Sequence, residues 1–252
     1  MRQLFDLHGK IAVVTGANTG LGQGIALALS QAGASIVLVG RSAPDETVAH
    51  IEANGGKYCV VHADLSDENG FEGIVDQSYE QLGGLDILVN NAGIIQRNDA
   101  IDFTIEQWDS VMNVNLRTVF FLSQAFARKC VEANRAGKII NIASMLSFQG
   151  GIRVPSYTAS KSGLMGLTRA LANEWARNKI NVNAIAPGYF ATNNTTALQA
   201  DPKRSAEILG RIPAGRWGKP SDLGGAAVFL ASRASDYVHG TTLTVDGGWL
   251  AR

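Results

Sequence analysis

Cysteine, histidine and long apolar runs are all scarce in this sequence of 252 residues. The two cysteines, Cys59 and Cys130, are well separated and belong to no spacing motif, so we expect reduced core thiols rather than a disulfide. The four histidines form no ligand-like cluster, and no metal site is expected. No apolar run approaches the ~18 residues of a membrane-spanning helix, and residues 1–10 lack an apolar signal core. These absences predict a cytoplasmic protein without a membrane partner.

An excess of charge of either sign is also missing. Lys and Arg total 22, as do Asp and Glu, so the formal net charge is +0. Nothing in this balance favours nucleic acid or an anionic membrane as a partner. The weak self-repulsion of a neutral chain is compatible with a homo-oligomer. No internal repeat or proline-rich linker divides the sequence, so residues 1–252 are expected to form one domain.

The chain does contain short apolar runs that alternate with segments of helical periodicity. Continuous short apolar runs are typical of strands that are covered on both faces. Their alternation with helices predicts an α/β fold, a Rossmann-type, doubly wound parallel sheet of about seven strands with helices on both faces. Ligands of such sheets bind at the carboxyl ends of the strands. The expected strands are residues 11–14, 36–39, 58–61, 87–89, 139–142, 182–185 and 242–245.

A glycine-rich turn follows the first expected strand. Glycine allows positive φ and a close approach of the backbone to a phosphate, and the N-terminus of the next helix supplies N–H groups and partial positive charge. The turn therefore predicts a dinucleotide-binding loop, and a tight strand-to-helix turn without a ligand is the alternative. The residues expected to bind the cofactor here are Thr15, Gly16, Asn18, Thr19, Gly20, Leu21 and Gly22.

The ends of later strands add further candidate cofactor contacts. Arg41 stands where dinucleotide folds carry an acid for a ribose 2′-hydroxyl or an arginine for a 2′-phosphate. It favours NADP(H), with a solvated surface arginine as the alternative. Asp64 is a candidate for the adenine amine or, equally, for the N-cap of the next helix. The other candidates at strand ends are Leu65, Asn91, Ala92, Gly93, Pro187, Gly188 and Thr192.

Tyr157 and Lys161 are four residues apart, a spacing that places two side chains on one face of a helix. Hydride transfer to a ketone builds negative charge on oxygen, which a nearby acid must neutralise. The unperturbed tyrosine pKa of ~10 is too high for this exchange at neutral pH, and an adjacent ammonium would lower it. Taken alone, the spacing is common by chance. Ser144 is placed to hold the carbonyl, and Asn115, disfavoured inside a helix, is expected to have a role.

Several motifs occur together and in a fixed order: Thr15-Gly16 with Gly20-Leu21-Gly22, Asn90-Asn91-Ala92-Gly93, Asn115, Ser144, Tyr157 with Lys161, and Pro187-Gly188. In this order they resemble the short-chain dehydrogenase/reductase family over essentially the whole chain. The resemblance implies that Tyr157 is the catalytic acid/base, that Lys161 lowers its pKa and binds the nicotinamide ribose, and that Ser144 orients the carbonyl. Asn115 would position Lys161 and a water that relays protons. The family commonly forms tetramers.

Within the family, residues 144–157, 191–194, 212–218 and 246–252 resemble members that act on keto-sugar acids of the gluconate type. This implies an NAD(P)-dependent oxidoreductase of a sugar acid, and an NAD preference that disagrees with Arg41. A sugar acid needs cations for its carboxylate and polar groups for its hydroxyls, although each candidate is alternatively a plain surface residue. Trp217 and Trp249 are expected to pack or to form an interface. The candidate substrate contacts are Arg97, Ser144, Gln149, Arg153, Tyr157, Asn193 and Asn194.

Two rival functions stay open. A 3-oxoacyl-carrier-protein reductase, or another short-chain alcohol dehydrogenase, would share every catalytic residue, and the carrier enzyme should show a basic docking patch. A cofactor-binding sensor without catalysis should have a damaged catalytic set, whereas all four residues are present: Asn115, Ser144, Tyr157 and Lys161. The sequence leaves open which hydroxyl reacts, the physiological direction and the subunit count.

Overall fold

The computed structural model describes residues 2–67 and 70–252. Within these residues, seven strands form one sheet in the order β3-β2-β1-β4-β5-β6-β7, and every neighbouring pair is parallel. The strand order reverses between β1 and β4, and such a switch point opens a crevice at the carboxyl ends of the strands. The strands are β1 (Ile11–Thr15), β2 (Ser35–Gly40), β3 (Tyr58–His62), β4 (Ile87–Asn90), β5 (Gly137–Ile142), β6 (Ile180–Pro187) and β7 (Thr242–Val245).

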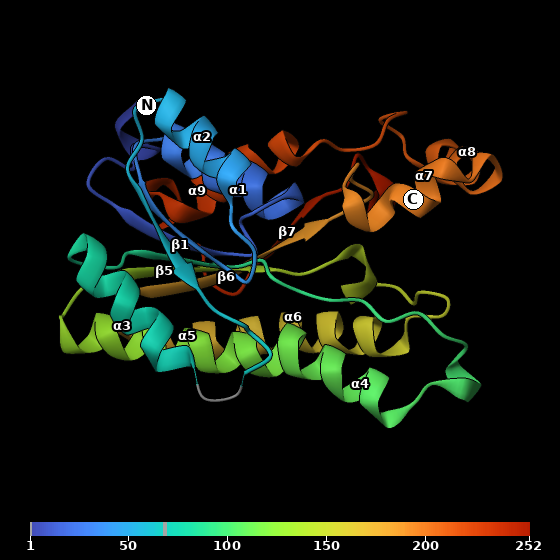
Figure 1. Cartoon of the computed structure of the whole chain (residues 1–252), viewed down its shortest axis with the longest axis horizontal. Coiled ribbons are helices and arrows are strands. Elements are labelled where there is room, and N and C mark those ends of the chain that lie inside the picture. Colours follow the sequence, from blue (N-terminus) through green and yellow to red (C-terminus); the bar gives the residue numbers. More distant parts are fainter. Residues whose placement is uncertain (1, 68–69) are drawn as a thin grey trace.

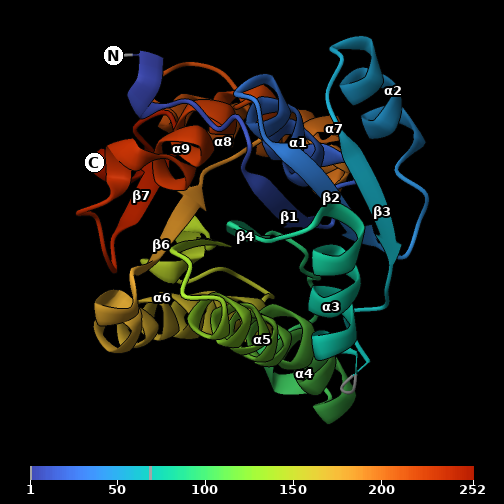
Figure 2. The same cartoon turned by 90° about the vertical axis from the view of Figure 1, so that its left-hand side faces the viewer.

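Helices cover both faces of the sheet, as Figures 1 and 2 show. Helices α1, α2 and α9 lie on one face, and α3 to α6 lie on the other. This arrangement confirms the predicted doubly wound fold and all seven predicted strands. The helices are α1 (Gly20–Gln31), α2 (Asp45–Ala53), α3 (Phe71–Leu82), α4 (Ile105–Met112), α5 (Thr118–Glu132), α6 (Pro155–Trp175), α7 (Thr196–Ala200), α8 (Pro202–Arg211) and α9 (Gly224–Ala231).

Two buried clusters, one on each face of the sheet, explain why most strands are continuous apolar runs in the sequence. Val14 belongs to the cluster under α1 with Ile25, whereas its neighbour Val13 belongs to the cluster under α5 with Phe126. Successive side chains of a strand point to opposite faces, so both must be apolar when both faces are covered. No helix among the described residues has the length and apolar character needed to cross a bilayer.

The two thiols are free, as the sequence predicts. Cys130 is buried, and this burial raises its pKa to about 12. Cys59 is half-buried, and burial raises its pKa to about 11. Both groups are therefore protonated at neutral pH and behave as inert packing residues rather than nucleophiles.

Helices α7 and α8 extend together beyond one end of the sheet (Figure 1). The carboxylate of Asp201 accepts hydrogen bonds from the N–H groups of Lys203 and Arg204 and so caps the first turn of α8. Ile208 is buried and anchors α8 in a small apolar cluster with Met145 and other residues. The sequence therefore holds α8 against the carboxyl ends of the strands.

Candidate active site

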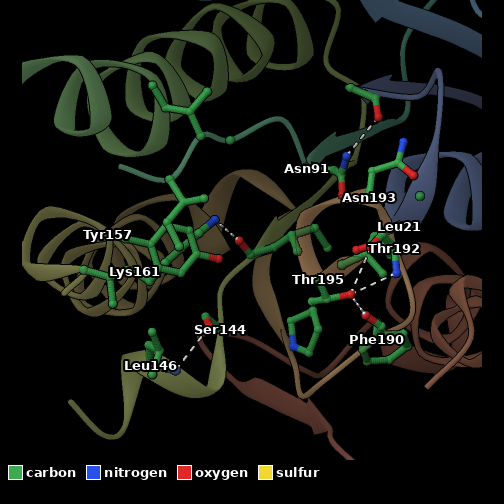
Figure 3. A pocket seen from close by; sticks show the side chains of 18 of the residues that line it. Leu21, Asn91, Ser144, Leu146, Tyr157, Lys161, Phe190, Thr192, Asn193 and Thr195 are labelled. Carbon is green, nitrogen blue, oxygen red and sulfur yellow. Dashed lines mark hydrogen bonds between the residues drawn. The ribbon is translucent and has the colours of Figure 1, made fainter. Parts of the chain in front are cut away.

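A cleft of about 850 Å³ lies at the carboxyl ends of the strands. Its cofactor half is lined by the turn after β1 and by the ends of β2 and β3. Its substrate half is lined by Arg97, Gln149, Tyr189 and α8. Figure 3 shows Tyr157, Lys161 and Ser144 on one side of this cleft, across from Leu21 and Thr192. The chemistry lies where the alternating fold predicts it.

The turn before α1 forms an open cradle. Gly20 has φ +59, a left-handed conformation that glycine adopts without strain. A Cβ on Gly22 would collide with the Gly16 carbonyl oxygen and the Asn91 side-chain amide, so only glycine fits this packing. Thr19 is the N-cap of α1, but its side chain makes no cap hydrogen bond, and the first turn has no acid. The N–H groups of this turn therefore face the cleft without a protein anion.

Asn91 fixes the turn to the end of β4. Its side-chain amide donates hydrogen bonds to the carbonyl oxygens of Thr15 and Gly16, at 2.9 and 3.2 Å. The Thr15 hydroxyl is buried behind the cleft, where it accepts from the N–H groups of Asn91 and Ala92. Thr15 is thus a support for the turn rather than part of the lining. The other predicted cofactor residues line the cleft: Gly16, Asn18, Thr19, Gly20, Leu21, Gly22, Arg41, Asp64, Leu65, Asn91, Ala92, Gly93, Pro187, Gly188 and Thr192.

Arg41 and Asp64 stand at the far end of the cofactor half. Their side chains are exposed and form a loose ion pair, with 3.8 Å between Nη1 and Oδ2. The Asp64 carboxylate accepts from the N–H and hydroxyl of Ser66, and these bonds hold its pKa below the ordinary value. The N-cap alternative for Asp64 is wrong, because α3 begins at Phe71. Arg41 therefore remains accessible at this end of the cleft, the position where the sequence predicts a contact with the adenosine ribose.

These residues fit a nicotinamide dinucleotide. The glycine cradle leaves room for a diphosphate at the N-terminus of a twelve-residue helix. Arg41 stands at the adenosine end, and the side of the cleft that holds Tyr157 and Lys161 is the nicotinamide end. The residues that would hold the dinucleotide are thus those of the cofactor half, and the group would supply or accept a hydride beside Tyr157.

The candidate acid/base Tyr157 and its neighbour Lys161 come from the first turns of α6. The Lys161 ammonium is buried, donates a hydrogen bond of 2.6 Å to the Ile142 carbonyl oxygen and lies 5.7 Å from the centroid of the Tyr157 ring. The Ser144 hydroxyl accepts from the N–H of Leu146, which leaves its own proton to donate (Figure 3). The spacing of Tyr157 and Lys161 places both on one helix face, as predicted.

The pKa of Tyr157 differs in direction from the expectation. Burial raises the pKa of the phenol, and the hydrogen bond from Ser144 and the charge of Arg97 only partly offset that effect. Lys161 is not among the groups that shift it, and burial lowers the pKa of Lys161 itself to about 8. A pKa above the ordinary value leaves the phenol protonated at neutral pH, which is the state that a proton donor requires.

Asn115 lies in a π-helical segment, Asn113–Arg117, between α4 and α5. Its side-chain oxygen accepts from the N–H of Ile94 at 2.8 Å, and its amide donates to the Ile94 carbonyl at 2.9 Å. The same amide donates to the Ser160 hydroxyl at 3.3 Å, next to Lys161 in sequence. Asn115 is buried behind the cleft and ties the loop after β4 to α6. It therefore supports the reacting residues from behind.

The predicted substrate residues divide into two groups. Arg97, Gln149 and Asn193 line the cleft. Arg153 does not: it has φ +63, and its Nε lies 2.9 Å from the Asp99 carboxylate. The structure therefore turns Arg153 toward an exposed ion pair rather than toward the cleft. The side chain of Asn194 lies outside the part of the chain that the structure describes.

Helix α8 contributes cleft residues that the sequence interpretation missed, namely Arg204, Glu207 and Arg211. Their spacing of three and four residues places them on one helical face, and this spacing is the sequence feature that could have identified them. Trp249 also lines the cleft, although its ring is buried in the cluster that contains Ile208, as the packing interpretation predicts.

Comparison with known proteins agrees with this site. A family model described as enoyl-(acyl carrier protein) reductase matches residues 16–250. The 2-dehydro-3-deoxy-D-gluconate 5-dehydrogenase of Escherichia coli is 62% identical over 248 residues, which cover 98% of each chain. A protein of Agrobacterium tumefaciens with bound NADP, provisionally described as a 2-deoxy-D-gluconate 3-dehydrogenase, is 57% identical, with a TM-score of 0.93 over 99% of each chain. A gluconate 5-dehydrogenase of Burkholderia cenocepacia, solved with NADP and tartrate, is 38% identical, with a TM-score of 0.94 over 100% of this chain and 99% of the other.

The fold, the glycine cradle and the Tyr157–Lys161 helix define the class. The chain belongs to the short-chain dehydrogenase/reductase family, as its motifs predict. It is an NAD(P)-dependent oxidoreductase that acts on CH–OH groups.

Proposed function

We propose that this protein interconverts 2-dehydro-3-deoxy-D-gluconate, or a closely related sugar acid, and its keto form oxidised at C5. The observation that carries the proposal is the charge of the substrate half. Three arginines line it, Arg97, Arg204 and Arg211, together with one acid, Glu207. This excess of positive charge suits a substrate with a carboxylate. The high identity to an enzyme of that name supports the choice of substrate, and the tartrate-bound relative supports binding of a hydroxy acid.

Each catalytic side chain has a separate role in the reduction of the ketone. Ser144 donates a hydrogen bond to the substrate carbonyl oxygen and orients the carbonyl, while its own proton stays in place. When bound, the reduced nicotinamide supplies the hydride to the carbonyl carbon. Tyr157 gives its phenolic proton to the carbonyl oxygen, which becomes the alcohol, and the phenolate recovers a proton from water. The nearby Lys161 ammonium adds positive charge at the end of the cleft where the substrate oxygen becomes negative. Oxidation runs through the same groups in reverse.

The proposal includes a preference for NADP(H) over NAD(H). Support comes from Arg41, which is exposed at the adenosine end of the cleft and pairs only loosely with Asp64. It also includes a cytoplasmic homo-oligomer in which residues 1–252 are one cofactor-binding and catalytic domain. The free thiols support a reducing compartment, and exposed apolar side chains on α4 and α5 support subunit contacts, such as Trp108 and Phe121.

A substrate panel tests this function. The purified protein is assayed with NADPH and with NADH against keto-sugar acids, neutral keto sugars and 3-oxoacyl thioesters. We expect the highest kcat/KM with a keto-sugar acid and NADPH. A decisive preference for the acyl thioester would contradict the sugar-acid assignment and support the acyl-carrier reductase instead. Binding of coenzyme without turnover of any substrate would support the non-catalytic sensor.

A further inference from the structure

Helix α8 brings two arginines to the substrate half of the cleft. Arg204 and Arg211 lie on the face of α8 that lines the cleft. Both charges act on Tyr189, where they lower a pKa that burial raises. The charge of Arg97 acts instead on Tyr157. The cleft thus has one cation at its reacting end and a separate pair at the wall that Tyr189 forms.

Arg211 is held in position by aromatic packing. Its guanidinium carbon lies 4.1 Å from the centroid of the Trp249 ring, a cation–π contact. The Trp249 ring is only 5% exposed and meets Tyr189 edge to face at 4.8 Å, so it is a rigid support. The Gln149 side-chain oxygen accepts from Trp249 Nε1 at 3.3 Å and from Arg211 Nη2 at 3.4 Å. Gln149 therefore links the ring and the guanidinium.

The donors of Arg211 remain available to a ligand. A guanidinium carries five N–H donors, and the long contact to Gln149 engages one of them. Arg204 differs, because its Nη1 lies 2.8 Å from the Glu207 carboxylate and its charge is already balanced. Arg97 stands near the phenol, where a sugar acid places its reacting carbon rather than its carboxylate. Of the three, Arg211 is the cation whose position and donors suit a carboxylate at the other end of the substrate.

We propose that Arg211, supported by Trp249 and Gln149, binds the C1 carboxylate of the substrate and makes the enzyme specific for acids over neutral sugars. This inference rests on the proposed function. It assigns Gln149 to positioning rather than to the hydroxyl contact that its sequence suggests. The aromatic support fixes the guanidinium before substrate arrives, so less conformational entropy is lost on binding.

The test compares the keto-sugar acid with its carboxamide, which has the same shape and no charge. Arg211→Met should lower kcat/KM for the acid by about 10- to 100-fold, because KM rises. It should leave kcat/KM for the carboxamide nearly unchanged. Lys203→Met is the matched control, because it removes the same charge from the same helix outside the cleft lining. Coenzyme affinity and the unfolding midpoint show whether each variant is folded.

Each outcome separates this inference from the proposed function. Equal losses on acid and carboxamide would assign Arg211 a structural role and overturn the inference. The inference would also be overturned if Lys203→Met lost as much kcat/KM for the acid, relative to the carboxamide, as Arg211→Met does. The same holds if Arg204→Met showed this selective loss and Arg211→Met did not. Equal reduction of the acid and the carboxamide by the unaltered enzyme would also overturn the inference. The proposed function fails separately, if the unaltered enzyme decisively prefers the 3-oxoacyl thioester.

Discussion

At the residue scale, the proposed reaction depends on the Lys161 ammonium, which is buried beside the Tyr157 phenol. Lys161 donates to a backbone carbonyl and has no carboxylate partner among the described residues. Burial therefore disfavours its charged form and lowers its pKa to about 8. Burial acts on Tyr157 in the opposite sense and raises its pKa. Below pH 8 the pair is thus a neutral phenol next to a cation, the arrangement that proton donation needs.

The rate of ketone reduction should follow the charge of Lys161. We expect kcat to be steady below about pH 8 and to fall above it by about tenfold per pH unit, because neutral Lys161 no longer stabilises the negative charge that develops on the substrate oxygen. The measurement is kcat against pH with saturating coenzyme. In Lys161→Arg the guanidinium stays protonated throughout this range, so any residual activity should lose the alkaline fall. A wild-type rate that is flat to pH 10 would contradict this role.

The local motifs of the site could be predicted because each is a pattern of residues that are close together in the sequence. Gly20, Tyr157 and Lys161 follow from spacing and from position at a strand end. The direction of Arg153 could not be predicted, since it depends on a left-handed backbone and on Asp99 more than fifty residues away. The pKa of Tyr157 was missed for a related reason: burial is a property of the folded chain, not of the four-residue spacing.

At the element scale, the helix from α4 to α5 carries Asn115 into position. The segment Asn113–Arg117 is wound as a π-helix, a form that is often found at functional sites. Its Asn115 satisfies both backbone groups of Ile94, on the loop that follows β4. The sequence does not predict the π-turn, because two asparagines weaken a helix but do not specify how it is wound. The pairing with Ile94 arises only when the loop and the helix meet.

Replacing Asn115 should damage both stability and activity. Asn115→Leu would leave the part-buried N–H and C=O of Ile94 without their side-chain partner, which should cost about 1–3 kcal/mol in unfolding free energy. We also expect kcat to fall, because α6 loses its link to the β4 loop through Ser160. Urea unfolding and steady-state kinetics measure the two effects. Ser160→Ala, which keeps the Ile94 pair, should cost about 1 kcal/mol or less. Equal stability of the two variants would refute this account.

The strands and most helices were predictable on the same scale. Strands β1 to β6 place apolar side chains in the clusters on both faces, so their apolar runs are continuous and easy to recognise. The cleft face of α8 was not recognised. Its Arg204 and Arg211 have the spacing of a solvated helix surface, and only the burial of Ile208 shows that this face meets the site.

At the scale of the whole molecule, chemistry and structural support lie at opposite ends of the sheet. The cleft occupies the carboxyl ends, whereas Asp86 joins elements at the amino ends. Its carboxylate accepts from the Ile11 N–H at 3.1 Å, from Lys10 Nζ at 3.2 Å and from Arg135 Nη2 at 2.9 Å. Asp86 is only 4% exposed, so these bonds link the starts of β1 and β4 to the segment before β5.

Removal of this carboxylate should affect stability without affecting the site. We expect Asp86→Ala to lower the unfolding free energy by about 1–3 kcal/mol, because a part-buried N–H and two partly exposed cations lose their acceptor. The KM values for both substrates should stay unchanged. Asp236→Ala is the control: it removes a surface partner of Lys138 and should cost under about 1 kcal/mol. If Asp86→Ala is as stable as this control, or if it changes KM, then stability and chemistry are not divided between the two ends of the sheet.

The central claim is that the phenolic proton of Tyr157 reaches the substrate oxygen, and Tyr157→Phe tests it most directly. The variant keeps the ring and loses only the hydroxyl, so the cradle for the dinucleotide should be intact. We expect NADPH to bind with nearly wild-type affinity while single-turnover reduction of the keto-sugar acid slows by about 100-fold or more. A variant that binds NADPH and reduces the substrate at close to the wild-type rate would contradict the account.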